Sequence, residues 1–420
     1  MRRFVFFIAL LYVLPVHGQQ LEEFIAANPD RAAGVLHVYE TFDTFDTPAP
    51  KGYKPFYISH YGRHGSRYHI RQTSFENSLK VLDEAAREGI LTDKGRQLKD
   101  VLSGLDAEHD DMTGILTQSG SRQHQDIASR MIANYPRVFR QKDRPVVYAV
   151  SSTSQRCLQS MANFCTIVKA SFPKLDIRYY TGPRFMKYIA HSYKNPGIGK
   201  RESEKRDSIA CAGIGDNFER LYKEVFSDPV RGREIADWTF FKDVFEALSI
   251  AQNLDIDAEG LLAGYFNTAE LASFNRSSNA HYFAIWGDTH EFGDSYVQNA
   301  GAPLLRDFIE KADAAVAGND HAADLRFGHD SFITPLLFLI GVEGYQSRSM
   351  PEAGETWPMA RYMCMGSNLQ MIFYRNRGGN VLVKIRRNES DVTIPALKSA
   401  GSPFYEWEPL REYLSGRIKR

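Results

Sequence analysis

The sequence predicts an α/β protein with a three-layer α/β/α core, a mostly parallel sheet and an inserted helical subdomain. Two short strand-like segments at 145–150 and 176–180 flank an amphipathic segment at 157–172. The order strand, helix, strand is typical of a parallel sheet whose faces are covered by helices. Helical spacing then dominates from about 184 to 281 with few strand signals, which indicates the insertion.

Length and charge restrict the classes of function that fit the chain. A chain of 420 residues with 43% hydrophobic and 24% charged residues has ordinary globular composition. Its length suggests two or three units, or one core with a large insertion. The formal net charge is zero, whereas proteins that bind nucleic acid usually carry a basic excess. We therefore expect no nucleic-acid partner, and any anion site must be a local concentration of cations.

The first residues have the layout of a secretory signal peptide. Two arginines at positions 2 and 3 precede an apolar run at 4–14, and small residues lead to Gly18. The run is shorter than the ~20 apolar residues of a normal membrane span, although retention as an N-terminal anchor stays an alternative. We expect cleavage after Gly18, export to the periplasm or the medium, and no stable membrane insertion.

The core and the insertion divide the remaining chain into three parts. We expect the first part of the α/β core at 19–184, a helical cap domain at 185–281 and the second part of the core at 282–420. In the first part, a strand at 56–58 is surrounded by helical segments. These helical segments are 21–36, 74–88, 93–105 and 121–135.

The loop at 59–68 carries a grouping of side chains that structure alone does not require. Arg63 and Arg67 lie on either side of His64, which Gly65 follows directly. Closely packed cations repel each other unless an anion lies between them. The arginine fork matches phosphate oxygens, glycine lets the backbone approach a ligand, and histidine can attack phosphorus. The tripeptide Arg-His-Gly alone is suggestive rather than decisive.

Two further polar loops also follow predicted strands. Arg156 lies at the end of the loop at 151–156, after the strand at 145–150. His329 and Asp330 follow a short strand at 324–327 and precede an apolar helix at 332–340. Ligands of parallel sheets bind at the carboxyl ends of the strands, so we expect the three loops to meet. A helix at 301–316 and a hairpin at 369–386 complete the core.

Taken in this order, the motifs resemble the histidine phosphatase superfamily in its acid phosphatase and phytase branch. The matching residues are Arg63-His64-Gly65-Ser66-Arg67, Leu116-Thr117, Gly120, Gln123-His124, Ser151-Ser152, Arg156-Cys157, Ser160 and His329-Asp330. The resemblance covers most of the chain after the signal and implies a phosphoglycerate-mutase-like core. Tyr68 after Arg67 looks particularly like the multiple inositol polyphosphate phosphatases.

The expected reaction assigns a role to each residue of the three loops. Arg63, Arg67 and Arg156, with His329 as a further donor, would neutralise the oxygens of a phosphate monoester. His64 would attack phosphorus and form a phosphohistidine. Asp330 would protonate the leaving alkoxide and then activate the water. We expect no metal and no cofactor.

Substrate choice depends on residues outside this group. Tyr68, His69 and Arg71 would line a polyanion pocket, with Lys187 on the opposite wall, although a solvated basic face explains them equally well. The inositol polyphosphate phosphatases typically have His-Ala-Glu where this chain has His329-Asp330-Ser331, a pair closer to acid phosphatases and acid phytases. We predict a monomeric phosphatase acting on inositol polyphosphates such as phytate.

Several alternatives remain open from the sequence. The enzyme alternative is a broad acid phosphatase; the others are a phosphate-binding protein without turnover and, less compatible with export, a mutase. The alternative role of Arg156 is a helix cap or a pair with a surface carboxylate. The alternative for His64 is an ordinary loop histidine, and that for Asp330 is the N-cap of the next helix, a role that Ser331 can also fill.

Cysteines and one further polar cluster complete the candidate residues. Cys157 and Cys165 lie eight residues apart on one predicted helix, about 12 Å along its axis, and cannot pair with each other. Any disulfide would involve Cys211 or Cys364, and free thiols are an equal alternative. A cluster of histidines and carboxylates has no tight metal-ligand spacing. It consists of His281, Asp288, His290, Glu291 and Asp294.

Overall fold

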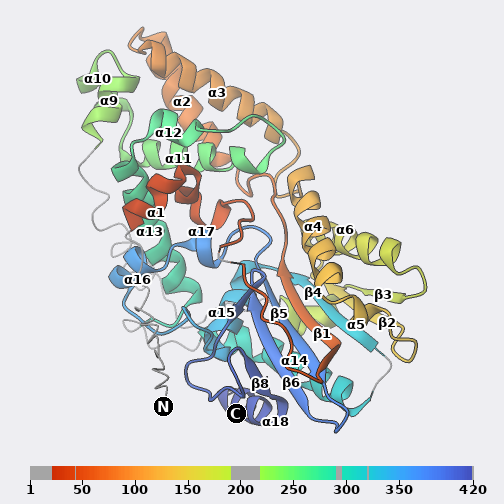
Figure 1. Ribbon diagram of the computed structural model, residues 1–420. Coiled ribbons are helices and arrows are strands. Elements are labelled where there is room, and N and C mark those ends of the chain that lie inside the picture. Colours follow the sequence, from red (N-terminus) through yellow and green to blue (C-terminus); the bar gives the residue numbers. More distant parts are fainter. Residues whose placement is uncertain (1–20, 43, 191–217, 290–295, 319–320, 419–420) are drawn as a thin grey trace, which may run out of the picture.

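The computed structural model describes residues 21–42, 44–190, 218–289, 296–318 and 321–418 (Figure 1). One sheet has the strand order β3-β2-β4-β1-β5-β6-β7, and β8 pairs with β6. The strands are β1 (Lys54–Arg63), β2 (Val146–Ser151), β3 (Asp176–Tyr180), β4 (His321–Gly328), β5 (Asn368–Arg375), β6 (Val381–Arg387), β7 (Ser390–Val392) and β8 (Phe404–Glu406).

The sheet has a parallel half and an antiparallel half that meet at β1. Strands β3, β2, β4 and β1 pair in parallel, whereas β1 pairs with β5 in the antiparallel direction and the C-terminal strands continue in this way. Every residue of β4 is buried, as are eight of the ten residues of β1. Burial on both faces is typical of the parallel strands in α/β proteins. The predicted α/β class is confirmed.

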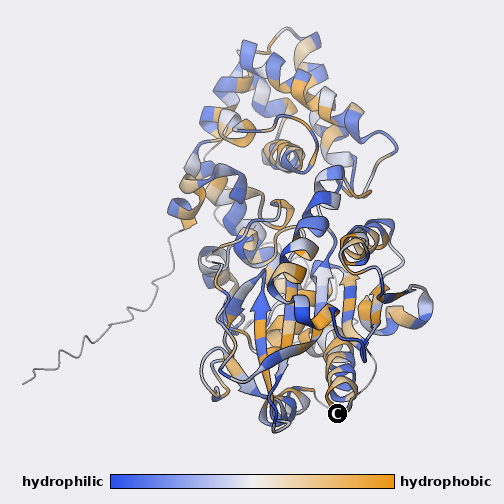
Figure 2. Cartoon of the chain, turned by 45° about the vertical axis from the view of Figure 1, so that its right-hand side comes forward, coloured by the Kyte–Doolittle hydropathy of each residue, from blue (hydrophilic) through white to orange (hydrophobic). Residues whose placement is uncertain are grey.

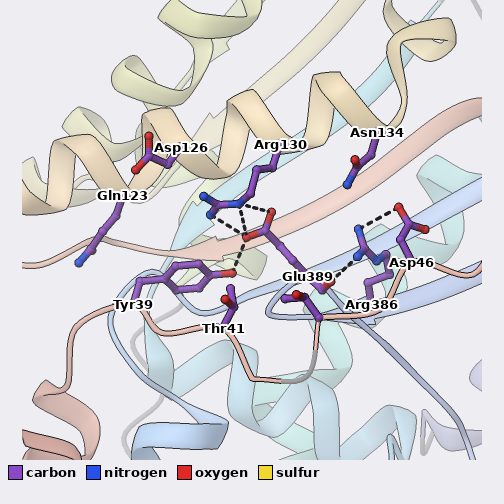
Figure 3. Close-up of a pocket in the computed structure, with 10 residues that line it drawn as sticks. Tyr39, Thr41, Asp46, Gln123, Asp126, Arg130, Asn134, Arg386 and Glu389 are labelled. Atoms are coloured by element: carbon purple, nitrogen blue, oxygen red, sulfur yellow. Dashed lines mark hydrogen bonds and ion pairs between the residues drawn. The ribbon is translucent and has the colours of Figure 1, made fainter.

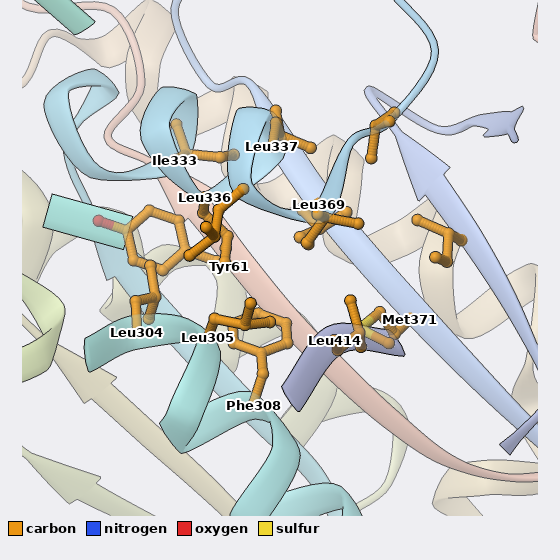
Figure 4. Packing of buried hydrophobic residues seen from close by; sticks show 14 of the residues in the cluster. Tyr61, Leu304, Leu305, Phe308, Ile333, Leu336, Leu337, Leu369, Met371 and Leu414 are labelled. Atoms are coloured by element: carbon orange, nitrogen blue, oxygen red, sulfur yellow. The ribbon is translucent and has the colours of Figure 1, made fainter. Parts of the chain in front are cut away.

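Helices cover both faces of the sheet. On one face, α4 (Gln118–Asn134), α5 (Pro136–Phe139) and α6 (Gln155–Ser171) pack on β1, β2 and β4. On the other face lie α7 (Pro183–Ile189), α14 (Tyr296–Ala317), α15 (Asp330–Ile340) and α18 (Trp407–Arg417). Figure 4 shows Tyr61 of β1 between leucines of α14 and α15, with Leu369 and Met371 of β5 beside them. The three layers of the expected core are therefore present.

A second hydrophobic core lies in a helical region beyond one end of the sheet (Figure 1). Its helices mix hydrophobic and hydrophilic residues around their circumference (Figure 2), the pattern expected when one face of a helix is buried. They are α1 (Leu21–Ala27), η1 (Pro29–Leu36), α2 (Thr73–Arg87), α3 (Asp93–His109), α9 (Glu219–Val225), α10 (Pro229–Ile235), α11 (Trp238–Ser249), η2 (Ala251–Asn253), α12 (Leu261–Tyr265) and α13 (Thr268–Trp286). The short helices α16 (Met350–Thr356) and α17 (Met359–Tyr362) follow later in the chain.

The helical region is assembled from more segments than the expected division at 184 and 281 implies. Helices α1, α2 and α3 precede residue 184, yet their buried residues belong to the same core as those of α9 and α11. Residue 281 lies inside α13, where burial continues at Phe283 and Ala284. The division into 19–184, 185–281 and 282–420 stays a prediction, and the packing adds the N-terminal helices to the helical region.

Some expected elements differ in detail. Strand β1 extends beyond the expected 56–58 and ends at Arg63, so His64 is the first residue of the loop. The expected helix at 21–36 is divided, because Pro29 begins a new 3-10 helix and Gly34 takes a positive φ of 58° within it. Among the described residues, no helix is both long enough and apolar enough to cross a membrane. The predicted signal peptide at 1–18 lies outside the described residues.

Candidate active site

Three neighbouring strands end at one edge of the sheet and bring the three predicted loops together. In the parallel register, Arg63 at the end of β1 pairs with Gly328 at the end of β4, and Ser151 of β2 pairs with Phe327. The His64 N–H donates to the Gly328 carbonyl at 2.9 Å. The loops that carry His64, Arg156 and His329 therefore start from adjacent positions, as the sequence predicted for the carboxyl ends of parallel strands.

The loop after β1 is fixed against helices α4 and α6. A Cβ atom added to Gly65 would lie 2.5 Å from the Gly120 carbonyl oxygen, so only glycine permits this close approach. The Gly65 N–H donates to Ser160 Oγ at 3.2 Å. Gln123 accepts from the Ser66 N–H and donates to Ser66 Oγ, both at 2.8 Å. These contacts hold the backbone on which His64 is mounted.

His64 is buried beside three arginines and has a defined tautomer. Its Nδ1 lies 2.9 Å from the Gly65 carbonyl oxygen, which can only accept, so Nδ1 carries the proton. Burial, followed by the charges of Arg63, Arg67 and Arg156, holds the pKa of His64 well below its usual range. The ring is therefore neutral near pH 7, and the lone pair is on Nε2.

Three arginines surround this histidine without satisfying all of their own donors. The Nε atoms of Arg63, Arg67 and Arg156 are buried and have no hydrogen-bond partner among the described residues. Arg63 Nη1 donates to the carbonyls of Val35 and Met363, at 2.8 and 2.7 Å, which fixes the guanidinium. Burial, with the charges of Arg63 and Arg156, lowers the pKa of Arg67 to about 9, so its side chain stays charged at neutral pH. Buried polar groups are normally paired, and this cluster is an exception.

His329 and Asp330 come to the same place from the end of β4. The rings of His64 and His329 lie with their centroids 5.6 Å apart, and His329 Nε2 lies 3.1 Å from Ser152 Oγ. Asp330 Oδ2 lies 2.7 Å from Arg63 Nη2. Burial raises the pKa of Asp330, but Arg63, His329 and Arg67 outweigh it, and the pKa lies below the usual value.

Asp330 is not the N-cap of the helix that follows it. The N-cap position of α15 belongs to His329, whose side chain makes no capping hydrogen bond, and Asp330 is the first helical residue. Asp330 Oδ1 accepts from the Ser331 N–H at 2.8 Å, which leaves Oδ2 directed at Arg63. Ser154 takes the N-cap position of α6, and its side chain likewise makes no capping hydrogen bond. Both helix ends add positive potential to the site.

The predicted substrate-binding residues differ in exposure. Arg71 is exposed, and so is Lys187 on α7. His69 is buried, and its Nδ1 donates to the Arg71 carbonyl at 2.5 Å. The Tyr68 hydroxyl donates to Glu108 at 3.3 Å. Tyr68 and His69 are therefore engaged with the chain around them, whereas Arg71 and Lys187 have side chains exposed to solvent.

Two tyrosines at the site carried no signal in the sequence. The Tyr61 hydroxyl accepts from the His329 N–H and donates to the Ile189 carbonyl, both at 3.0 Å. Burial and the charges of Asp330 and Glu246 raise the pKa of Tyr282 to about 12, which keeps this phenol protonated near the site. Tyr61 belongs to a strand and Tyr282 to a distant helix, so only the tertiary structure brings them to this edge.

The cysteines and the cluster of histidines and carboxylates form no further site among the described residues. Cys157, Cys165 and Cys364 are buried free thiols, and Cys211 lies outside the described residues. Within the described part of the chain, no group of three or more histidine, cysteine or acidic residues is arranged to hold a metal ion. His281 and Asp288 are described, whereas His290, Glu291 and Asp294 are not.

A separate polar cavity of about 450 Å³ lies between α4 and the strands β6 and β7 (Figure 3). Its two arginines are paired with carboxylates. Arg130 binds Glu389 with Nη2 at 2.8 Å, and the Tyr39 hydroxyl donates to Glu389 at 2.9 Å. Arg386 pairs with Asp391 at 3.1 Å and with Asp46 at 3.6 Å.

Comparison with known proteins gives structural neighbours only. No family model matches the sequence, and neither does any curated protein. The multiple inositol polyphosphate phosphatase of Bifidobacterium longum, in complex with inositol hexasulfate, matches with a TM-score of 0.75 and 21% identity over 93% of this chain and 98% of its own. The phytase of D. castellii matches with a TM-score of 0.69 and 14% identity over 93% and 85%.

A more distant neighbour belongs to the same group. The phytase of Hafnia alvei matches with a TM-score of 0.54 and 11% identity over 89% of this chain and 98% of its own. The structural matches establish the fold, and at identities this low they establish no more than the fold. The chain has the fold that these inositol polyphosphate phosphatase and phytase structures share, the branch of the histidine phosphatases that its motifs resemble.

Proposed function

We propose that this protein is a phosphomonoesterase that hydrolyses inositol polyphosphates such as phytate through a phosphohistidine intermediate. One observation carries the proposal: the buried Nε atoms of Arg63, Arg67 and Arg156 have no partner among the described residues, and they surround a neutral histidine. Three guanidinium groups with unmet donors need a ligand with several anionic oxygens. A phosphate monoester meets this need and offers phosphorus to the histidine.

The first step is an in-line attack of His64 Nε2 on phosphorus. The N–P bond forms as the P–O bond to the leaving alkoxide breaks, and the arginines stabilise the equatorial oxygens. The Gly65 carbonyl accepts from Nδ1 and supports the positive charge that the ring acquires. His329 and the uncapped N-termini of α6 and α15 add to this stabilisation.

Asp330 is the proposed proton donor, and its ion pair explains how it could gain a proton. In the free protein, Arg63 is the main charge that holds the pKa of Asp330 below its usual value. A phosphate dianion on Arg63 would compete for the guanidinium and add negative charge beside the carboxylate. Both effects raise the pKa of Asp330, so substrate binding would favour the protonated carboxyl that the leaving alkoxide requires. The resulting carboxylate would then take a proton from the water that attacks the phosphohistidine.

The names of the neighbours support the choice of substrate. The B. longum structure is a complex with inositol hexasulfate, and the other two neighbours are phytases. Arg71 and Lys187 supply exposed positive charge for further phosphate groups. The alternative is a broad-specificity acid phosphatase, which the His329-Asp330 pair in place of His-Ala-Glu favours. We also propose that the mature protein is exported, monomeric and independent of metal ions.

Replacement of the nucleophile tests the reaction. We expect His64→Ala to lower kcat for phytate by about 10⁴-fold or more, because no other group can form the covalent intermediate. Acid-quenched wild-type enzyme should carry labelled phosphate on His64, and the variant should carry none. Phosphate release by His64→Ala at the wild-type rate, with chelator present, would refute the mechanism. A ratio of kcat/KM that favours a small aryl phosphate over phytate would support the broad acid phosphatase.

Replacement of the acid tests the role of Asp330. Asp330→Asn should lower kcat/KM for phytate by ~10²–10⁴-fold, the usual contribution of a general acid. For p-nitrophenyl phosphate the loss should be smaller, because nitrophenolate leaves without a proton. Equal losses on both substrates would show that the carboxylate acts mainly by positioning Arg63. The Ser331→Ala variant is the matched control for the start of α15.

A further inference from the structure

A groove of about 770 Å³ lies at the end of the sheet away from the candidate active site. Lys54 begins β1 and Arg63 ends it, so at ~3.3 Å per residue the groove and the site lie about 30 Å apart. The groove is lined by six cations, namely Lys51, Lys54, Arg137, Arg144, Arg375 and Arg377. Asp143 is the only carboxylate among its described lining residues. In a chain of zero net charge this is a strong local excess.

Two of these arginines form a fixed base. The guanidinium carbons of Arg375 and Arg144 lie 4.3 and 5.3 Å from the centre of the Phe56 ring. Arg144 donates to the Ala315 carbonyl at 3.1 Å, and Arg375 donates to the Val316 carbonyl at 2.5 Å. Both carbonyls are near the C-terminus of α14, whose negative end attracts cations. The base is therefore rigid and positively charged before any ligand arrives.

The other four cations form an open rim. Lys51, Lys54, Arg137 and Arg377 are exposed. None of the four has an ion pair or a side-chain hydrogen bond to any residue in the described part of the chain. Arg377 belongs to the tight turn between β5 and β6, which the Gly379 N–H closes onto the Asn376 carbonyl. The four rim cations thus line one groove without ion pairs among the described residues, and Asp143 is the single carboxylate in the described lining.

We propose that this groove is a second binding site, for a compact anion that carries several phosphate groups. Six cations against one carboxylate leave an excess of about five positive charges at the groove. A ligand with five or six negative charges within a few ångströms balances this excess, whereas inorganic phosphate does not. The concave shape also favours a compact ligand over a flat lipid surface. The site binds without turnover, because its described lining contains no histidine, cysteine or hydroxyl nucleophile.

Calorimetric titration with inositol hexasulfate, which is not hydrolysed, tests this site. The protein is the His64→Ala variant, and we expect two molecules to bind at about 0.1 M salt. Adding Lys51→Glu and Arg377→Glu should weaken the binding of one of these two molecules by about 10–100-fold, because each substitution replaces attraction to the anionic ligand by repulsion. The control variant is Lys80→Glu with Arg87→Glu on α2, which makes the same change in net charge at the far end of the molecule. It should still bind two molecules of inositol hexasulfate.

The outcomes separate this site from the proposed active site. If the His64→Ala variant binds only one molecule, and the added Lys51→Glu and Arg377→Glu substitutions abolish that binding, the ligand still binds in the groove. That result would count against the proposed active site instead. Unchanged binding in that variant, equal loss in the Lys80 and Arg87 control, or binding only to phosphatidylglycerol vesicles would each overturn the proposal. Titration with tripolyphosphate shows whether the inositol ring is needed. In the wild-type background, Lys51→Glu with Arg377→Glu should leave kcat for p-nitrophenyl phosphate unchanged and the melting temperature close to that of the control.

Discussion

Arginines gather both at the candidate active site and at the polar cavity of Figure 3, but their pairing differs. In the cavity, Arg130 and Arg386 bind carboxylates on three acidic residues. At the active site, Asp330 is the one carboxylate paired with Arg63, and the Nε atoms of Arg63, Arg67 and Arg156 have no described partner. The cavity is polar, yet its arginines already have carboxylate partners. Unsatisfied donors, rather than cavity size, therefore mark the place where a charged ligand is needed.

The titration behaviour of the arginines shows the same difference. Burial lowers the pKa of Arg386, but Tyr135, Asp46 and Asp391 outweigh it and the pKa rises above its usual value. Burial also lowers the pKa of Arg67, and there the neighbouring arginines add to the decrease. The first network stabilises its charges through the fold itself. The second holds like charges together and becomes favourable when an anion binds.

Among the tests of this comparison, the largest expected effect comes from removing a cation that has no carboxylate partner. Arg67→Ala should lower kcat/KM by about 10²–10³-fold, the usual loss when one donor to transition-state charge is removed. The free energy of unfolding should change little, because a repulsion is removed together with the packing of the side chain. Steady-state kinetics and urea denaturation measure the two quantities on the same protein.

The response to phosphate sharpens this test. At 100 times its dissociation constant, a ligand that binds only the folded state stabilises by about 2.7 kcal/mol. Wild-type protein should show this rise with inorganic phosphate, whereas Arg67→Ala should need a much higher concentration. A large loss of stability in Arg67→Ala without ligand would show that Arg67 stabilises the fold, as Arg386 does, rather than binding a ligand.

The second prediction concerns a paired charge. Lys384 is fully buried and binds Asp46, with Asp391 3.6 Å away. Asp46→Ala would leave Lys384 with a more distant partner, and breaking a buried pair from one side costs about 3–5 kcal/mol. We expect a loss near the lower limit, measured by urea denaturation, because Asp391 remains. Activity per folded molecule should be unchanged; a fall in kcat comparable to that of Arg67→Ala would contradict the comparison.

The sequence could predict the loop residues of the candidate active site because local patterns place them. His64, Arg156 and His329 each follow an apolar strand, and parallel strands bring such loops to one edge. The exact start of α15 could not be predicted, so Asp330 was an open N-cap candidate. Helix boundaries depend on capping geometry that shifts easily by one residue, and here His329 takes the N-cap position.

Contacts between distant segments were beyond the reach of the sequence. Tyr61 holds the His329 backbone from a different strand, and Tyr282 approaches from α13. The pairing of Arg130 with Glu389 joins residues 259 positions apart. The packing of α2 against α11 likewise depends on a tertiary interface. None of these contacts follows from periodicity within one segment, which is why the helical region was expected to begin only after residue 184.

The smallest expected effect is a change in pH dependence, and it tests how the cations act on His64. A histidine with its ordinary pKa of about 6.5 would lose about fivefold of its neutral form between pH 6.5 and 5.5. Burial, then Arg63 and Arg67, holds the pKa of His64 well below that value, so the neutral nucleophile should persist throughout this interval. Removing Arg67 raises the pKa of His64, and more of the ring becomes protonated as the pH falls.

The ratio of kcat/KM for Arg67→Ala to that for wild type should therefore decrease from pH 6.5 to pH 5. p-Nitrophenyl phosphate is the suitable substrate, because its leaving group needs no proton from Asp330 and its own ionisation cancels in the ratio. A wild-type profile that falls with an apparent pKa near 6.5, together with a constant ratio, would show that the arginines do not control the protonation of His64. Asp46→Ala, which changes a paired carboxylate, should leave the ratio independent of pH, because its charge lies in the satisfied network and not around the nucleophile.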